Sequence, residues 1–118
     1  MTKPLALIVE DDPHLNQIFA LTLETSFEIE TVTDGSHALK RISEVVPRLI
    51  VLDINLPGAS GAEVLDAIRA DSRLNATRVI LATANPQEAA ILRDKADIVL
   101  LKPISPTQLR ELAERMKV

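Results

Sequence analysis

Short apolar runs alternate along the chain with segments in which apolar positions recur at three- and four-residue spacing. Runs rich in Val, Ile and Leu are typical of buried strands, whereas the three- and four-residue spacing is typical of helices that bury one face. Five strands and five helices in alternation predict repeated βα units around a parallel sheet. The expected strands are Leu5–Val9, Glu28–Thr33, Leu49–Leu52, Val79–Ala82 and Ile98–Leu101.

The second expected strand differs from the other four. Residues 27–32 read Phe-Glu-Ile-Glu-Thr-Val, which alternates apolar with polar, while the other strands are continuously apolar. Alternation indicates one exposed face, so we expect this strand at an edge of the sheet. The simplest doubly wound α/β arrangement with that edge has the strand order 2-1-3-4-5, the flavodoxin-like fold, flanked by five helices. The sequence predicts a single domain over residues 1–118.

Three of the expected helices have clear start signals. A side chain with a capping oxygen precedes a proline at Asp12-Pro13, Asn85-Pro86 and Ser105-Pro106. Proline at the first helical position loses no hydrogen bond, so these pairs predict helix starts. The spacing of a capping box, in which a Glu or Gln follows the cap by three residues, occurs at Ser60 and Glu63, Asn85 and Glu88, and Ser105 and Gln108.

Composition narrows the classes of protein. A hydrophobic content of 47% favours a packed globule, and the chain has no apolar run of the roughly 20 residues that span a bilayer. The N-terminus lacks the features of a signal peptide, so we expect a cytoplasmic protein without membrane contact. With no cysteine there are no disulfides or thiolate metal sites. A net charge of -4 disfavours direct binding to nucleic acid.

Polar residues follow four of the expected strands. Glu10-Asp11-Asp12 come after the first strand, Asp53 after the third, Thr83 after the fourth and Lys102-Pro103 after the fifth. In a doubly wound sheet, ligands bind beyond the carboxyl ends of the strands, at the point where the strand order reverses. That point lies between the first and third strands, so we expect these side chains on one rim.

The acidic residues on this rim predict a metal site. Glu10, Asp11 and Asp53 would place three carboxylates within reach of one another, and these repel unless a cation or protons offset their charge. Oxygen ligands of this number suit Mg²⁺, which is commonly shared with a substrate phosphate. Asp12 is explained as a helix cap. The alternative for Asp53 is an aspartate that ends a strand and accepts a hydrogen bond from its own turn.

Thr83 and Lys102 gain significance as a pair. Each alone is explained as a β-branched strand residue or a solvated surface charge. Together they supply a hydroxyl donor and a positive charge beside a divalent metal, which is what a transferring phosphoryl group requires. His14 and His37 are not spaced as a metal-binding pair and are expected to be exposed helix residues.

The motifs as a set resemble the receiver domains of bacterial two-component response regulators, with a chemotaxis-regulator-like fold. The resemblance covers essentially the whole chain. The motifs that carry it are Ile-Val-Glu-Asp-Asp at residues 8–12, Leu-Asp-Ile-Asn-Leu-Pro-Gly at 52–58 with Gly61, Ala-Thr-Ala at 82–84 and Leu-Lys-Pro at 101–103.

This resemblance implies roles for individual residues. Asp53 would be the phosphorylated nucleophile, Asp11 would bind Mg²⁺ directly, Glu10 would bind it through water, and the backbone carbonyl of Asn55 would be a further ligand. Thr83 and Lys102 would contact the phosphoryl oxygens, and the Lys102-Pro103 bond would be cis.

The resemblance also implies partners. The donor would be a phosphohistidine on a sensor histidine kinase or a histidine phosphotransfer protein. A conformational change would pass the signal to a partner protein or an output domain, and hydrolysis of the acyl phosphate would reset it.

Two positions depart from the family pattern. Val99 stands three residues before the lysine, where members often carry an aromatic, and Lys95-Ala96-Asp97 stands where they often carry Gly-Ala-Asp. Val99 has no aromatic ring that could change rotamer and turn toward the protein interior on phosphorylation. We therefore expect the response to be a modest shift of the Thr83 loop and the fourth helix.

Three other functions are compatible with parts of this pattern. An aspartyl-nucleophile phosphatase resembles a pattern with a second Asp two residues after the first, but Asn55 occupies that place here and the chain has no room for a substrate cap. A flavodoxin-like nucleotide binder needs a loop of N–H donors after the first strand, where this chain has acids that would repel phosphate. A receiver-like dimerisation module without phosphorylation stays open.

Overall fold

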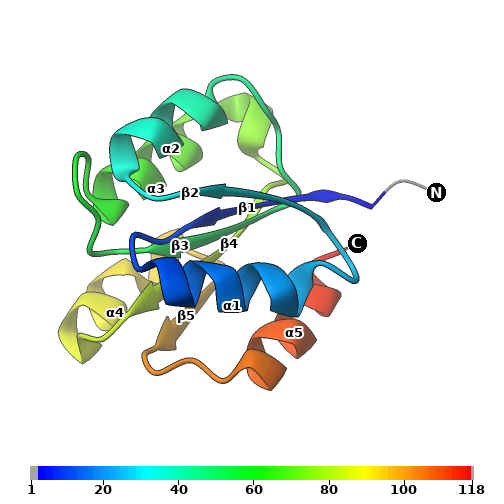
Figure 1. The fold of residues 1–118 in the computed structure, drawn as a ribbon. Helices are drawn as coiled ribbons and strands as arrows, with labels where there is room; N and C mark the ends of the chain where they lie inside the picture. Colours follow the sequence, from blue (N-terminus) through cyan, green and yellow to red (C-terminus); the bar gives the residue numbers. More distant parts are fainter. Residues whose placement is uncertain (1–2, 118) are drawn as a thin grey trace.

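A five-stranded parallel sheet forms the centre of the computed structural model, which describes residues 3–117 (Figure 1). The strands lie in the order β2-β1-β3-β4-β5 and all neighbours pair in parallel, so the predicted fold and strand order are confirmed. The strands are β1 (Leu5–Val9), β2 (Glu28–Val32), β3 (Leu49–Asp53), β4 (Arg78–Thr83) and β5 (Ile98–Leu101).

Helices cover both faces of the sheet (Figure 1). One apolar cluster joins the sheet to α1 and α5, and a second joins it to α2 and α3, while α4 packs beside β4 and β5. The helices are α1 (Pro13–Leu23), α2 (Gly35–Ile42), α3 (Gly61–Ala70), α4 (Pro86–Leu92) and α5 (Pro106–Arg115), and short 3-10 helices follow at Ser72–Leu74 and Arg93–Lys95. No helix within the described residues is long and apolar enough to cross a membrane.

The central strands are buried on both faces. Along β3, Leu49 and Val51 enter the cluster with α1 and α5, whereas Ile50 and Leu52 enter the other one. Successive side chains of a strand point to opposite faces, so a strand covered on both sides must be apolar throughout. β2 is more exposed and lies at the edge, as its alternating sequence predicts.

The predicted helix starts are confirmed at Pro13, Pro86 and Pro106. The Asp12 carboxylate accepts from the backbone N–H of His14 at 2.9 Å, and Asn85 and Ser105 cap their helices in the same manner. These bonds satisfy backbone donors that have no partner within the helix.

Some strand boundaries differ from the prediction. β2 ends at Val32 rather than Thr33, β3 extends one residue to Asp53, and β4 runs from Arg78 to Thr83. The extensions follow from pairing, because Asp53 lies opposite Ala82 and Thr83 opposite Leu101. Two candidate site residues therefore sit on strand ends whose backbone is held by the sheet.

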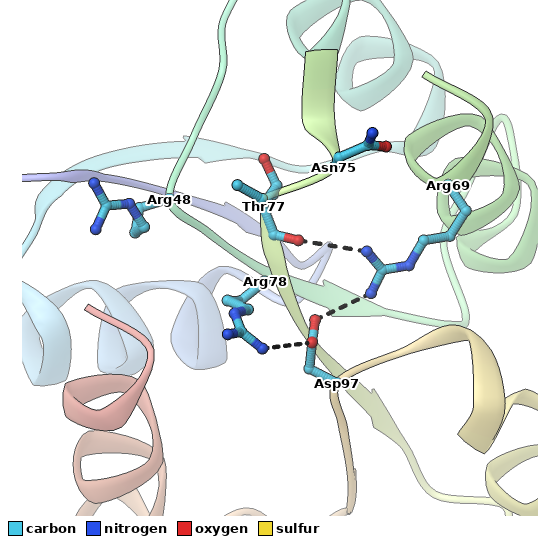
Figure 2. A pocket seen from close by; sticks show the side chains of 7 residues that line it. Arg48, Arg69, Asn75, Thr77, Arg78 and Asp97 are labelled. Atoms are coloured by element: carbon cyan, nitrogen blue, oxygen red, sulfur yellow. Dashed lines mark hydrogen bonds and ion pairs between the residues drawn. The ribbon is translucent and has the colours of Figure 1, made fainter. Parts of the chain in front are cut away.

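A hollow of about 460 Å³ lies at the amino ends of the strands, away from the candidate site. Figure 2 shows Arg69 and Arg78 directed at Asp97, with ion pairs of 3.0 and 3.2 Å. The Asp97 carboxylate also accepts from the backbone N–H of Val79 at 2.7 Å, and Arg69 donates to the carbonyl of Thr77 at 3.4 Å. These donors are engaged by the protein itself, so Asp97 ties α3, β4 and the start of β5 together.

Candidate functional site

The three predicted carboxylates meet beyond the carboxyl ends of β1 and β3. Glu10, Asp11 and Asp53 each offer an oxygen that lies within 4.8 Å of the others. Val9 pairs with Leu52 in the sheet, so the residues that follow these two are brought side by side. Glu10 is 1% exposed and Asp53 is 2% exposed, while Asp11 is exposed to solvent. The cluster is therefore buried on one side and open on the other.

Lys102 lies against the two buried carboxylates. Its Nζ is 3.2 Å from an oxygen of Glu10 and 3.2 Å from an oxygen of Asp53, and its side chain is 22% exposed. Its backbone N–H donates to the carbonyl of Thr83 at 2.8 Å, which anchors the turn after β5 to the end of β4. The Lys102-Pro103 bond is cis, as the resemblance implied.

Burial and charge act together on the ionisation of this cluster. Burial, reinforced by the Asp53 charge, raises the pKa of Glu10 to about 7, although the Asp12 N–H and the Lys102 ammonium oppose the rise. Burial would lower the pKa of Lys102, but the neighbouring Asp53 and Glu10 charges outweigh it and raise that pKa. One ammonium therefore offsets only part of the charge of a cluster of three carboxylates, and the cluster favours additional positive charge or a proton.

The exit from β3 is tightly folded around Asp53. The Asp53 Oδ1 accepts from the backbone N–H of Asn55 at 3.3 Å, so the bond to its own turn exists together with the Lys102 contact. A Cβ on Gly61 would lie 2.3 Å from the Asp53 carbonyl oxygen and 2.5 Å from the Ile54 Cα. Only glycine permits this approach of α3 to the end of β3. Gly58, with φ of 75°, makes the turn between them.

Thr83 is fully buried, and its hydroxyl is bonded on both sides. The hydroxyl donates to a carboxylate oxygen of Glu88 at 3.1 Å and accepts from the backbone N–H of Asn85 at 3.1 Å. The spacing of Asn85 and Glu88 predicted a capping box, in which the Glu88 carboxylate would accept from the Asn85 N–H. In the structure the Thr83 hydroxyl lies between these two groups: it accepts from the Asn85 N–H and donates to the Glu88 carboxylate, so the Asn85 N–H and Glu88 are not bonded directly.

Glu88 is the site residue that sequence reasoning assigned only to a helix cap. Its position in the first turn of α4, five residues after Thr83, is the signal that could have pointed to it. His14 and His37 are exposed on α1 and α2, as expected. Val99 is half-buried and packs against the apolar cluster on the α2 and α3 face.

The donor set fits a hard divalent cation. Three carboxylate oxygens converge, and the open side at Asp11 leaves room for water ligands, which Mg²⁺ usually retains. The residues present therefore suit Mg²⁺ by ligand type and by charge. The backbone carbonyl of Asn55 as a further ligand stays a prediction.

Comparison with known proteins gives one consistent result. A family model described as "Response regulator receiver domain" matches residues 6–114. The chain is similar to the DNA-binding response regulator MtrA of Mycolicibacterium smegmatis, with 34% identity over 104 residues, which cover 87% of this chain and 46% of that protein. The chain thus spans less than half the length of this relative.

Solved structures share the fold. The chemotaxis response regulator CheY4 of Vibrio cholerae is 28% identical, with a TM-score of 0.87 over 98% of this chain and 99% of that one. The receiver domain of a sensor histidine kinase from Pseudomonas aeruginosa, solved with a magnesium ion coordinated in its active site cleft, has a TM-score of 0.88 at 24% identity and covers 98% of both chains.

Proposed function

The chain belongs to the response regulator receiver domain family, and from this membership we propose that Asp53 accepts a phosphoryl group in a Mg²⁺-dependent reaction. Receiver domains are phosphoacceptor signalling modules of two-component systems rather than classical enzymes. The observation that carries the proposal is the buried Asp53 carboxylate, which shares a 4.8 Å cluster with Glu10 and Asp11 and lies 3.2 Å from Lys102.

The transfer would form an O–P bond to an Asp53 carboxylate oxygen and break the N–P bond of a phosphohistidine, whose imidazole leaves with the bonding electron pair. Lys102 would then exchange its contact with Asp53 for a phosphoryl oxygen, because the carboxylate charge has moved onto the phosphoryl group. Thr83 would donate its hydroxyl to another phosphoryl oxygen. The nucleophile needs no base, since Asp53 attacks as a carboxylate.

Glu10, Asp11, Asp53 and the carbonyl of Asn55 would hold Mg²⁺. The chemistry that Mg²⁺ supplies when bound is neutralisation of charge on the phosphoryl oxygens. The carboxylate cluster of this chain supports the assignment by its ligand type, and the same fold accommodates magnesium in the Pseudomonas aeruginosa receiver domain.

Receiver domains interact with histidine kinases. For this chain we propose a phosphohistidine donor on a sensor histidine kinase or a histidine phosphotransfer protein, and an output through a partner protein or a further domain. The net charge of -4 argues against direct binding of nucleic acid by this chain, because such binding needs clustered positive charge. A single receiver domain over residues 1–118 and a cytoplasmic location stay predictions.

Intact-mass measurement after incubation with Mg²⁺ and acetyl phosphate tests the proposal. Wild type should gain one phosphoryl group, and Asp53→Asn should gain none because the nucleophilic oxygen is lost. Asp34→Asn is the matched control, since it makes the same chemical change at the cap of α2, where Asn caps equally well. A chelator should abolish the label. Stable labelling of Asp53→Asn, or of wild type without a divalent cation, would contradict the assignment.

A further inference from the structure

The single proton of the Thr83 hydroxyl is already committed in this structure. It is donated to the Glu88 carboxylate at 3.1 Å, and the oxygen accepts from the Asn85 N–H. A hydroxyl has one donor, and the Thr83 side chain is fully buried. The phosphoryl contact that the proposed function assigns to Thr83 therefore requires that the bond to Glu88 opens first.

We propose that Glu88 is a positioning residue that acts as a latch: it holds the Thr83 hydroxyl turned toward α4 until Asp53 carries a phosphoryl group. This inference rests on the proposed function. It assigns regulation to a residue outside the acidic cluster of Glu10, Asp11 and Asp53, whose action passes through Thr83.

Electrostatics explains why phosphorylation of Asp53 would open the bond between Thr83 and Glu88. A phosphoryl group adds negative charge and strong acceptor oxygens on the same rim, so it competes with the Glu88 carboxylate for one proton. The backbone of Thr83 is held by pairing of β4 with β5 and by the 2.8 Å bond from the Lys102 N–H. The hydroxyl can therefore redirect by side-chain rotation while the strand stays in place.

Opening the latch would loosen the start of α4. Thr83, Asn85 and Glu88 form a closed set of bonds, because Asn85 also accepts from the Glu88 N–H at 3.4 Å. α4 has seven residues, of which Ala89 is buried, and Ile91 is 76% exposed. Few apolar contacts hold this helix, so loss of these bonds acts on an element of low local stability. Because Val99 has no aromatic ring that could change rotamer, we expect the response to phosphorylation to be a movement of α4.

The rate of Asp53 labelling by acetyl phosphate in Mg²⁺ tests the latch. Glu88→Ala should raise the rate about three- to tenfold, because a competing charged hydrogen bond is removed. Glu88→Gln keeps a neutral acceptor and should give a smaller rise. Gln87→Ala, an exposed neighbour in the same turn, should leave the rate unchanged. Should Glu88→Ala fail to fold by far-UV circular dichroism, Glu88→Gln carries the test.

A double-mutant cycle with Thr83→Val separates a latch from a merely structural role. Valine keeps the shape of threonine and lacks the hydroxyl, so Glu88→Ala should have no effect on the labelling rate in that background. An equal rise in both backgrounds would overturn the latch. Wild type that takes up no phosphoryl group would overturn the proposed function and the latch together, whereas wild type labelled at Asp53 with Glu88→Ala at the same rate would overturn the latch alone.

Discussion

Lys102 offsets two buried carboxylates with one ammonium group. Its Nζ lies 3.2 Å from both Glu10 and Asp53, and all three side chains are largely shielded from solvent. Removing one partner of a buried ion pair leaves the other charge uncompensated, which costs more than the pair itself contributes. The lysine is therefore a structural cation of the domain as well as a candidate phosphoryl contact.

Lys102→Met should lower the free energy of unfolding in metal-free buffer by about 1 to 3 kcal/mol, below the fully buried range because the lysine is partly exposed. Added Mg²⁺ should stabilise the variant more than wild type, since the cation replaces the missing charge by binding the folded state. Far-UV circular dichroism is the measurement, because the chain has no Trp or Tyr.

Lys95→Met is the control for this comparison. It removes an ammonium that pairs with Asp66 on the surface, and such exposed pairs contribute at most about 1 kcal/mol. An equal Mg²⁺ increment in wild type and Lys102→Met would show that Lys102 does not share the charge of the acidic cluster.

The acidic residues of the site were predictable, and the Glu88 contact was not. Glu10, Asp11 and Asp53 follow strand patterns, and parallel strands bring their carboxyl ends to one rim whatever the side-chain rotamers. The Glu88 carboxylate can accept from either of two nearby donors, the Asn85 N–H or the Thr83 hydroxyl. Rotamers decide between them, and the sequence does not encode that choice in its pattern.

The junction of β3 and α3 sets the position of Asp53. Gly61→Ala should lower the free energy of unfolding by about 1 to 3 kcal/mol and reduce labelling of Asp53, because a Cβ would lie 2.3 Å from the Asp53 carbonyl oxygen and force the strand end to move. Thermal melts and the acetyl phosphate assay measure the two effects.

Ala62→Gly, the reverse change one residue later in α3, is the matched control. It should cost only the helix propensity difference of about 0.5 to 1 kcal/mol and leave labelling at the wild-type rate. Wild-type labelling by Gly61→Ala would mean that the loop adapts without displacing Asp53.

The starts of helices were predicted best where a capping residue and a proline stand next to each other in the sequence. Pro13, Pro86 and Pro106 marked three helix starts, whereas α2 begins after Asp34 without a proline and was less clearly marked. The ends of β3 and β4 were placed one residue short, because ladder pairing with the neighbouring strand extends them and pairing partners are distant in sequence.

Asp97 connects three parts of the molecule at the end of the sheet opposite the site. Burial alone would raise the pKa of Asp97, but the Val79 N–H and the ion pairs with Arg69 and Arg78 outweigh it and lower that pKa below its ordinary 3.8. A depressed pKa in the folded state contributes stability above the unfolded pKa, and this is lost as pH falls through the folded value.

Asp97→Asn should therefore be less stable than wild type by about 1 to 2 kcal/mol at neutral pH. The difference should stay constant above about pH 5 and shrink in more acidic buffer, since the unfolded wild-type chain takes up a proton at Asp97 before the folded one does. Denaturant unfolding across pH measures this. Asp66→Asn, at an exposed ion pair, should show little difference at any pH. A gap that widens in acid would contradict the lowered pKa.

The parallel topology has a consequence during synthesis. Translation delivers β1 first, but β1 lies between β2 and β3, so its second edge stays unpaired until β3 has left the ribosome. Glu10, Asp11 and Asp53 are then all made before Lys102, which follows the last strand. A nascent chain consequently carries all three acids without the lysine from the addition of Asp53 until the addition of Lys102. Water and dissolved ions screen that charge until β5 docks.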